Sequence, residues 1–398
     1  MKKSKEIFCA LAHTGKLVSG NSFEVCCQIQ RNQSDRDVPG EEYREYVKGK
    51  LRQGVKLREC RRCWVKEEAG IKSYRKHNNT VLVSRAEEQL LINDHSAVLG
   101  TRHLEIILSN ICNLACQMCE PILSTKWMST VKSNDAFKDE IFRGKYEYSK
   151  VYYNTYTEDD IKDLKVIKLM GGEPFYMKES FELLNRLDEI GRCGEMEFHT
   201  PTNCMIFPDE DIIDVILSFK KIYINVSFDG VGELNDYIRM HSKWDHVIGN
   251  FLKWHELSTK HKHVEIIVSN TITILNVNQT HEFINYFLKY LPSNALHPTP
   301  TEYPDHLSIS LIPKKIGLPL IEPLKYVNHR VYKMVRSVLG SAPIAKWPNL
   351  GSLKGERDII GLKLKHHFNS VEKVLGKTFK EVNPTMAEII EGLVGDMK

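Results

Sequence analysis

Residues 112–119 read Cys-Asn-Leu-Ala-Cys-Gln-Met-Cys and place three thiols in a C-x3-C-x2-C spacing. A fully ligated [4Fe–4S] cluster takes four thiolates, so a group of three favours a cluster with one iron open to another ligand. The apolar run Leu104–Leu108 precedes the motif and predicts a buried strand. The cysteines therefore lie on a loop at the carboxyl end of a strand, where barrel enzymes place their chemistry. Part of a zinc site, or buried thiols without a common function, are the alternatives.

A second motif follows the next predicted strand, Val166–Met170, and consists of Gly171, Gly172, Glu173 and Pro174. Paired glycines at a strand end let a ligand approach the main chain closely, because no side chain stands in the way. A lone Gly-Gly pair would be an ordinary turn. A GGEP turn one strand after a C-x3-C-x2-C motif is a much more specific signal than a lone Gly-Gly pair. The two motifs together resemble the radical S-adenosylmethionine superfamily.

The resemblance implies a reaction. A [4Fe–4S] cluster on Cys112, Cys116 and Cys119 would pass an electron to S-adenosylmethionine bound at the open iron, and the resulting 5′-deoxyadenosyl radical would take a hydrogen atom from a substrate. The GGEP turn would bind the amino group of the methionine moiety, and Met118 would pack near the adenine. A reductant such as flavodoxin or ferredoxin is the implied partner.

The rest of the central region predicts alternating strands and helices, which indicate a parallel sheet. Further strands are expected at residues 195–199, 222–228, 263–268 and 306–312, and helices at 178–190, 209–219, 244–257 and 279–290. Six strands match the partial (β/α)6 TIM-like barrel of the resembled family. The expected fold is α/β, with a small cysteine-rich module before the barrel and a helical extension after it.

Polar residues at the strand ends correspond to cofactor contacts of the family. Asn203 lies where the family has Thr-Asn-Gly, although Cys204 replaces the glycine. Ser227 begins a stretch that resembles the family's Ser-x-Asp-Gly strand end. Arg239 resembles the arginine with which related enzymes bind the cofactor carboxylate. Asn270 ends the next strand and would reach the ribose or the substrate. Each of these residues would otherwise be an ordinary cap or turn residue.

A second group of cysteines lies in the amino-terminal region, where Cys60 and Cys63 form a C-x2-C knuckle. Gly20, Phe23 and Cys26, with residues 48–75, resemble the SPASM and twitch modules that bind auxiliary iron–sulfur clusters. The resemblance extends over most of residues 8 to about 315.

Four thiolates would complete one auxiliary [4Fe–4S] cluster. The resemblance implies Cys9, Cys26, Cys60 and Cys63 as its ligands, with Cys26 preferred over Cys27. An ordinary four-cysteine zinc site is the alternative. The corresponding alternative for the whole protein is a non-catalytic, zinc-stabilised module that binds nucleic acid or protein.

Composition limits the location and the partners. No apolar run approaches 18 residues, which argues against a membrane span, and cluster thiolates require a reducing, cytoplasmic location. Residues 44–76 hold twelve Lys or Arg against four Glu. This excess favours an acidic or phosphate-bearing substrate, unless the segment is a solvated helix face.

The expected domains are 1–95 for the auxiliary module, 96–315 for the barrel and 316–398 for the extension. Helices are expected in the extension at residues 324–339, 357–375 and 385–397.

Overall fold

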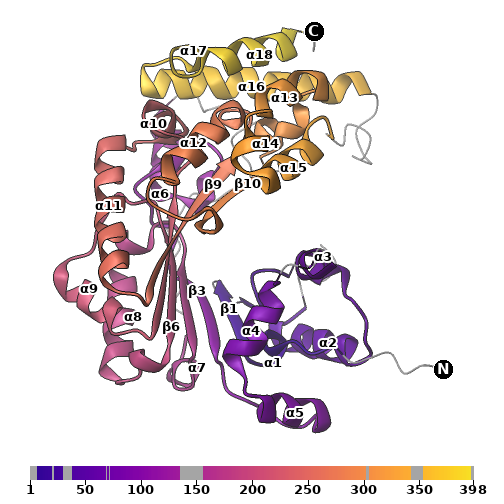
Figure 1. The fold of residues 1–398 in the computed structure, drawn as a ribbon, viewed down its shortest axis with the longest axis vertical. Coiled ribbons are helices and arrows are strands. Elements are labelled where there is room, and N and C mark those ends of the chain that lie inside the picture. Colours follow the sequence, from indigo (N-terminus) through magenta and orange to yellow (C-terminus); the bar gives the residue numbers. More distant parts are fainter. Residues whose placement is uncertain are drawn as a thin grey trace. The chain divides into compact units, whose positions relative to one another are not determined.

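The computed structural model describes residues 7–19, 22–29, 38–68, 70, 72–134, 156–301, 304–341 and 353–395. Gly20 and the last residues of the expected terminal helix lie outside the described residues. An eight-stranded sheet has the order β10-β9-β7-β6-β5-β3-β1-β2, and β4 and β8 form a separate two-stranded sheet (Figure 1). The strands are β1 (Gly15–Ser19), β2 (Ser22–Glu24), β3 (His103–Ile107), β4 (Ala115–Cys116), β5 (Val166–Met170), β6 (Glu197–Thr202), β7 (Lys221–Ser227), β8 (Arg239–Met240), β9 (Val264–Ile272) and β10 (Leu296–Pro300).

Six strands, from β3 to β10, follow one another in chain order across the sheet. β1 and β5 pair with β3 in parallel, β6 pairs with β5 in parallel, and β10 pairs with β9 in parallel. The order is open, with β10 and β2 at its two ends. The predicted α/β fold is confirmed, and the sheet contains six successive strands, although the last of them lies at other residues than predicted.

The chain divides into two compact units. Unit 1 comprises residues 1–109, 151–200 and 208–223, and unit 2 comprises residues 110–150, 201–207 and 224–398. The helices of unit 1 are α1 (Ala10–Thr14), α2 (Gly40–Arg52), α3 (Arg61–Glu68), α4 (Tyr74–Leu82), α5 (Arg85–Asn93), α7 (Glu158–Ile161), α8 (Lys178–Glu189) and α9 (Glu210–Leu217).

Alternation of apolar and polar residues builds the sheet of unit 1. Leu104 and Ile106 of β3 are fully buried, as are Ile167 and Leu169 of β5. Helices α8 and α9 lie next to each other, and α8 buries its leucines on one face because they recur at helical spacing (Figure 1). Both helices match their predicted positions.

The helices of unit 2 are α6 (Thr125–Ser133), α10 (Glu233–Ile238), α11 (Trp244–Lys260), α12 (Thr280–Phe287), α13 (Lys314–Ile321), α14 (Leu324–Val327), α15 (His329–Val338), α16 (Leu353–Leu375), α17 (Phe379–Val382) and α18 (Pro384–Gly395). Helix α11 packs on β9, and α12 and α15 pack on β10. Helices α11 and α12 match their predicted positions.

The prediction of a sixth strand at residues 306–312 is wrong. That segment forms two short 3-10 turns, Asp305–Leu307 and Ile309–Leu311, and the sixth strand is β10. Pro298 and Pro300 argue against a strand at the residues of β10, because proline lacks the N–H that a central strand needs. They are tolerated because β10 lies at the end of the sheet order.

The carboxy-terminal extension is helical, as predicted, but its first helix is broken. Residues 324–339 form α14 and α15, and Asn328 between them adopts an extended conformation. The side chain of Asn328 accepts a hydrogen bond from Val331 N (3.1 Å) and so caps α15. Helices α16, α17 and α18 lie together (Figure 1).

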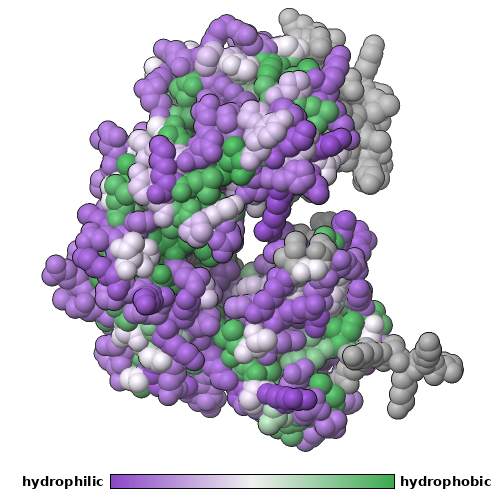
Figure 2. Space-filling model, viewed as in Figure 1, coloured by the Kyte–Doolittle hydropathy of each residue, from purple (hydrophilic) through white to green (hydrophobic). Residues whose placement is uncertain are grey.

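The face in Figure 2 is mostly hydrophilic, with hydrophobic residues interspersed. Among the described residues, no helix combines the length and the apolar character required to cross a membrane.

Candidate functional site

The three-cysteine loop of unit 2 is anchored to the helix that follows it. Thr125, the first residue of α6, hydrogen-bonds through its hydroxyl to the main chain of Cys112 (3.2 Å). The indole N–H of Trp127 donates to the carbonyl oxygen of Cys119 (3.0 Å). Both ends of the motif are therefore fixed through their main-chain atoms, and these anchors do not use the three thiols.

Cys116 and Cys119 form the tight part of the loop. Cys119 N donates to Cys116 O (2.9 Å), and β4 pairs with β8 so that Cys116 lies opposite Arg239. A hydrogen bond between the two thiols raises the pKa of Cys116 and lowers that of Cys119. The lowered pKa of Cys119 favours its thiolate, the form that binds iron, while Cys116 keeps its proton as the donor of this hydrogen bond. Three cysteine sulfurs on one loop are the donor type that an iron–sulfur cluster takes.

Arg239 is held by a buried ion pair. Its Nε donates to Asp229 Oδ2 (2.7 Å), and Thr271 N donates to Asp229 Oδ1 (2.7 Å). Burial alone would lower the pKa of Arg239, but the charges of Asp229, Cys116 and Cys119 outweigh it and raise the pKa. Arg239 is thus a permanent cation beside the cysteine loop.

Asn203 lies next to the first cysteine. Its Nδ2 donates to Asn113 Oδ1 (2.8 Å) and lies 3.9 Å from Cys112 Sγ. Cys204 has φ +59°, the left-handed conformation in which the resembled family has glycine. The turn therefore keeps the conformation that glycine favours, although a cysteine occupies it.

The remaining predicted residues of unit 2 are Asn270 in β9, Ser227 at the end of β7 and Met118 in the cysteine loop. Asn270 is buried, donates from Nδ2 to Phe228 O (3.2 Å), and leaves its Oδ1 without a partner among the described residues. A buried acceptor without a partner indicates a place for an absent ligand. Ser227 and Met118 are each half-buried.

In unit 1 the GGEP turn follows β5. Gly172 N donates to Ser109 O (3.0 Å), and Glu173, which is buried, accepts a hydrogen bond from Phe175 N (3.3 Å) and caps the short helix Pro174–Tyr176. Gly171 has φ +130°, and a Cβ at this position would lie 2.4 Å from Ser109 O. Only glycine fits this position.

We expect Gly171→Ala to destabilise the protein far more than Gly191→Ala. Both glycines have positive φ, but a Cβ at Gly191 meets open space. Gly191→Ala should cost about 1 kcal/mol for the conformation, and Gly171→Ala about 3 kcal/mol because a main-chain clash is added. Denaturant unfolding measures both; equal losses would contradict the clash.

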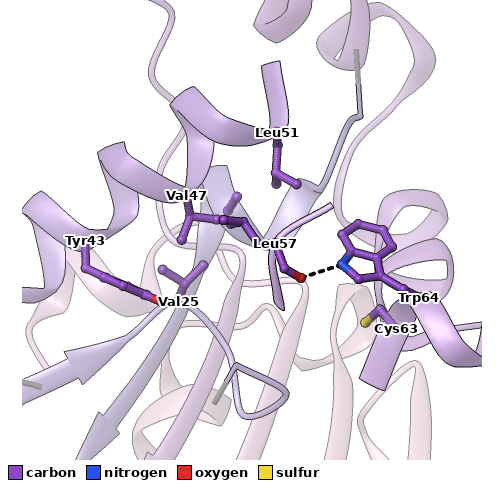
Figure 3. Packing of buried hydrophobic residues seen from close by; sticks show 8 residues of the cluster. Val25, Tyr43, Val47, Leu51, Leu57, Cys63 and Trp64 are labelled. Atoms are coloured by element: carbon purple, nitrogen blue, oxygen red, sulfur yellow. Dashed lines mark hydrogen bonds between the residues drawn. The ribbon is translucent and has the colours of Figure 1, made fainter. Parts of the chain in front are cut away.

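The amino-terminal cysteines of unit 1 gather around one cavity. Cys9, Cys26, Cys60 and Cys63, the four predicted ligands, all line it, together with apolar side chains and Arg75. Figure 3 shows the packing on one side, where Trp64 donates from its indole N–H to Leu57 O (2.7 Å).

These thiols influence one another. Burial raises the pKa of Cys9 to about 11 and that of Cys60 to about 12, and it raises the pKa of Cys26 as well. Neighbouring cysteines add to the shift in each case. The raised pKa values keep Cys9, Cys26 and Cys60 protonated, and their conversion to thiolates would require neutralising cations, which iron or zinc would supply. The described residues include no three His, Cys, Asp or Glu side chains placed to hold a single metal ion.

Cys27 does not line the cavity and belongs to a separate polar group. Its sulfur lies 3.8 Å from Lys168 Nζ, which in turn donates to Glu105 Oε2 (3.1 Å). Tyr74 joins this group by hydrogen-bonding to Glu105 and His103. Burial lowers the pKa of His103 to about 4.

Several neighbours of the site carry no signal in the sequence that predicts their role. Asp229 stood in the recognised Ser-x-Asp-Gly motif, but its partnership with Arg239 was not predicted. Asn276, which donates to Asp229 O (2.8 Å), and His367, described below, carry no local motif. Only their positions in the folded chain bring them to the site.

A scan against models of protein families finds no match, and a search of curated proteins finds no relative. Among solved structures, the chain is similar to native anSMEcpe with bound AdoMet at 16% identity and a TM-score of 0.37, over 57% of this chain and 61% of that one. It is also similar to Streptococcus suis SuiB bound to S-adenosylmethionine at 13% identity and a TM-score of 0.36, over 73% of this chain and 61% of that one. The chain thus spans less than two thirds of the length of these structures.

Proposed function

We propose that this chain is a radical S-adenosylmethionine enzyme. A [4Fe–4S] cluster and S-adenosylmethionine, when bound, would supply a 5′-deoxyadenosyl radical that abstracts a hydrogen atom from a substrate. The observation that carries the proposal is the loop of Cys112, Cys116 and Cys119, fixed through its main chain with Arg239 beside its thiols.

The residues of unit 2 would then have distinct tasks. The three cysteines hold the cluster, and Arg239 offers a buried positive charge to a carboxylate. Asn270 offers an unpartnered acceptor, Oδ1, to a hydroxyl or amine. Asn203 holds the first cysteine's neighbour, Asn113, and thereby the start of the loop.

Anaerobic reconstitution with iron and sulfide tests this function. We expect a brown protein that forms 5′-deoxyadenosine from S-adenosylmethionine when dithionite is added. A protein with an intact cluster that forms none would disprove the proposal. A colourless protein that binds zinc would instead indicate the non-catalytic alternative.

We also propose that the four cysteines of unit 1 hold an auxiliary [4Fe–4S] cluster. The support is their arrangement around one cavity, together with the raised pKa values of Cys9, Cys26 and Cys60, to which neighbouring cysteines contribute. The cavity provides four thiols, which would fill every iron site of a cubane. Such a cluster would exchange electrons with the substrate and would not bind it directly.

The double variant Cys60→Ala/Cys63→Ala should lose about four iron atoms per chain. It should still form 5′-deoxyadenosine without substrate, because Cys112, Cys116 and Cys119 are untouched. Cys27→Ala is the control, since Cys27 does not line the cavity, and it should keep its iron. Elemental analysis measures the iron content. An unchanged iron content in the double variant would indicate that the wild-type site holds zinc or no metal.

We propose an acidic or phosphate-bearing substrate. Not all cations of residues 44–76 are available to a substrate. Arg44 is buried and donates to Gly15 O, and Arg75 is paired with Glu67. Arg58, Arg61 and Arg62 remain exposed on one short stretch, which supports an electrostatic role.

Changing Arg58, Arg61 and Arg62 to Glu should weaken substrate binding and reduce its dependence on salt. Both clusters should persist, because the side chains are exposed. The matched control changes exposed Lys262, Lys289 and Lys315 to Glu. Equal substrate affinity in the two triple variants, measured across a salt series, would remove the basis for an anionic substrate.

A further inference from the structure

Helix α16 supplies a buried polar group to the three-cysteine loop. The ring Nε2 of His367 lies 2.8 Å from Oε1 of Gln117, although 250 residues separate the two. Gln117 follows Cys116 directly, and both Gln117 and His367 are almost completely buried. A buried hydrogen bond of this kind is costly to break, because both partners lose access to water.

The direction of this bond follows from its neighbours. Gln117 Nε2 faces Tyr237 O at 2.7 Å, and a carbonyl oxygen only accepts, so the amide N–H donates there. The amide oxygen therefore faces His367, which must donate from Nε2. Gln117 N also donates to Ile238 O (2.9 Å), so side chain and main chain fix the residue together. Burial lowers the pKa of His367 well below its usual range, which keeps the ring neutral.

Helix α16 is itself fixed on both sides of His367. Lys363 donates to Asp305 Oδ2 (2.9 Å), and the ring of His306 lies 4.9 Å from that of His367. On the other side, Phe368 stacks on Phe379 with ring centroids 5.2 Å apart.

Phe379, on α17, also contacts the helix that holds Gln117. Its ring centroid lies 5.2 Å from that of Tyr237 on α10. Lys377, just before α17, pairs with Glu233 at the start of α10 (2.7 Å). The carboxy-terminal helices thus contact Gln117 by two routes. His367 hydrogen-bonds to it directly, and Phe379 packs on Tyr237, whose carbonyl oxygen accepts from Gln117.

We propose that His367 is a positioning residue for the cysteine loop. Through Gln117 it holds the turn from Cys116 to Cys119 against the end of α10, where Arg239 follows. The carboxy-terminal helices would therefore be part of the cofactor-binding machinery. Where it concerns cofactor binding, this inference rests on the proposed function.

The first test needs no cofactor. The full-length apoprotein is alkylated with iodoacetamide, and the rate is followed at each cysteine by mass spectrometry. We expect Cys116 to react about tenfold faster in His367→Ala than in wild type, because one buried hydrogen bond is lost and Oε1 of Gln117 is left without its partner. His367→Gln, whose terminal amide replaces the Nε2 donor, should restore the wild-type rate.

Two controls separate positioning from unfolding. His366→Ala removes an imidazole from the same turn of α16 but leaves the Gln117 bond in place, so Cys116 should react as in wild type. Cys193, buried in unit 1, should react equally slowly in all variants. A wild-type rate at Cys116 in His367→Ala, or an equal acceleration at Cys193, would overturn the positioning role.

The second test follows the reconstituted proteins by electron paramagnetic resonance. His367→Ala should need about tenfold more S-adenosylmethionine than wild type to change the spectrum of the reduced cluster, and His367→Gln should not. An unchanged requirement in His367→Ala would overturn the link to cofactor binding. If wild type itself shows no response, the proposed function fails, while the alkylation rates still decide the role of His367.

Discussion

Replacing Cys112, Cys116 or Cys119 with Ala should abolish 5′-deoxyadenosine formation and lower iron by about four atoms per chain. The physical reason is that two thiolates cannot hold a cubane that needs three protein ligands and one open iron. The loss of activity should therefore be complete in each single variant. Iron analysis, absorption spectra and chromatography of the nucleoside products measure the effect.

Cys193→Ala is the matched control for these three variants. Cys193 is also a buried thiol outside any disulfide, but it lies in a short turn of unit 1. Burial raises its pKa, and no cysteine is among the described groups that shift it. We expect wild-type iron and wild-type activity in this variant. Activity retained by any of the three loop variants would show that the loop does not hold the essential cluster.

Asp229→Ala should destabilise the protein by about 3–5 kcal/mol, because it leaves the buried guanidinium of Arg239 without its counter-charge. The ion pair is 2.7 Å long, and Asp229 is fully buried. Asp229→Asn should not restore the wild-type state, because two N–H groups, from Arg239 and Thr271, face the carboxylate and an amide offers only one oxygen. Denaturant unfolding of the apoprotein measures this loss.

The double variant Asp229→Ala/Arg239→Met should recover part of the stability, since no unpaired charge remains. It should not recover activity, because the cation beside the cysteine loop is gone. Asp159→Ala, which removes an exposed ion pair with Lys162, should unfold at the same denaturant concentration as wild type. A stability within about 0.5 kcal/mol of wild type for Asp229→Ala would contradict the buried-charge argument.

The local motifs of this protein could be predicted from its sequence. The C-x3-C-x2-C loop and the GGEP turn are fixed by spacing along the chain, and their strands are marked by short apolar runs. For the same reason five of the six successive strands were placed correctly. The sixth failed because Pro298 and Pro300 contradict the usual pattern of a strand, and only its place at the end of the sheet order makes them acceptable.

For the amino-terminal cysteines, the surroundings of each thiol depend on the folded chain and not on the local sequence. The resemblance implies Cys9, Cys26, Cys60 and Cys63 as a set, and only the spacing from Gly20 favours Cys26 over its neighbour Cys27. In the structure, Cys26 lines the cavity and Cys27 lies beside Lys168. The chain turns directly after Cys26, so two adjacent thiols enter different surroundings, one at the cavity and the other in the polar group of Glu105 and Lys168.

The sequence by itself therefore determined the chemistry that this protein carries: three thiols on a loop, a glycine turn, and strands that alternate with helices. The tertiary structure decided which distant residues support that chemistry. Arg239 pairs with Asp229 across ten residues, and His367 reaches Gln117 across 250 residues, because folding brings these side chains together in the interior of unit 2. Such contacts depend on how the whole core packs, and no spacing between neighbours in the chain encodes them.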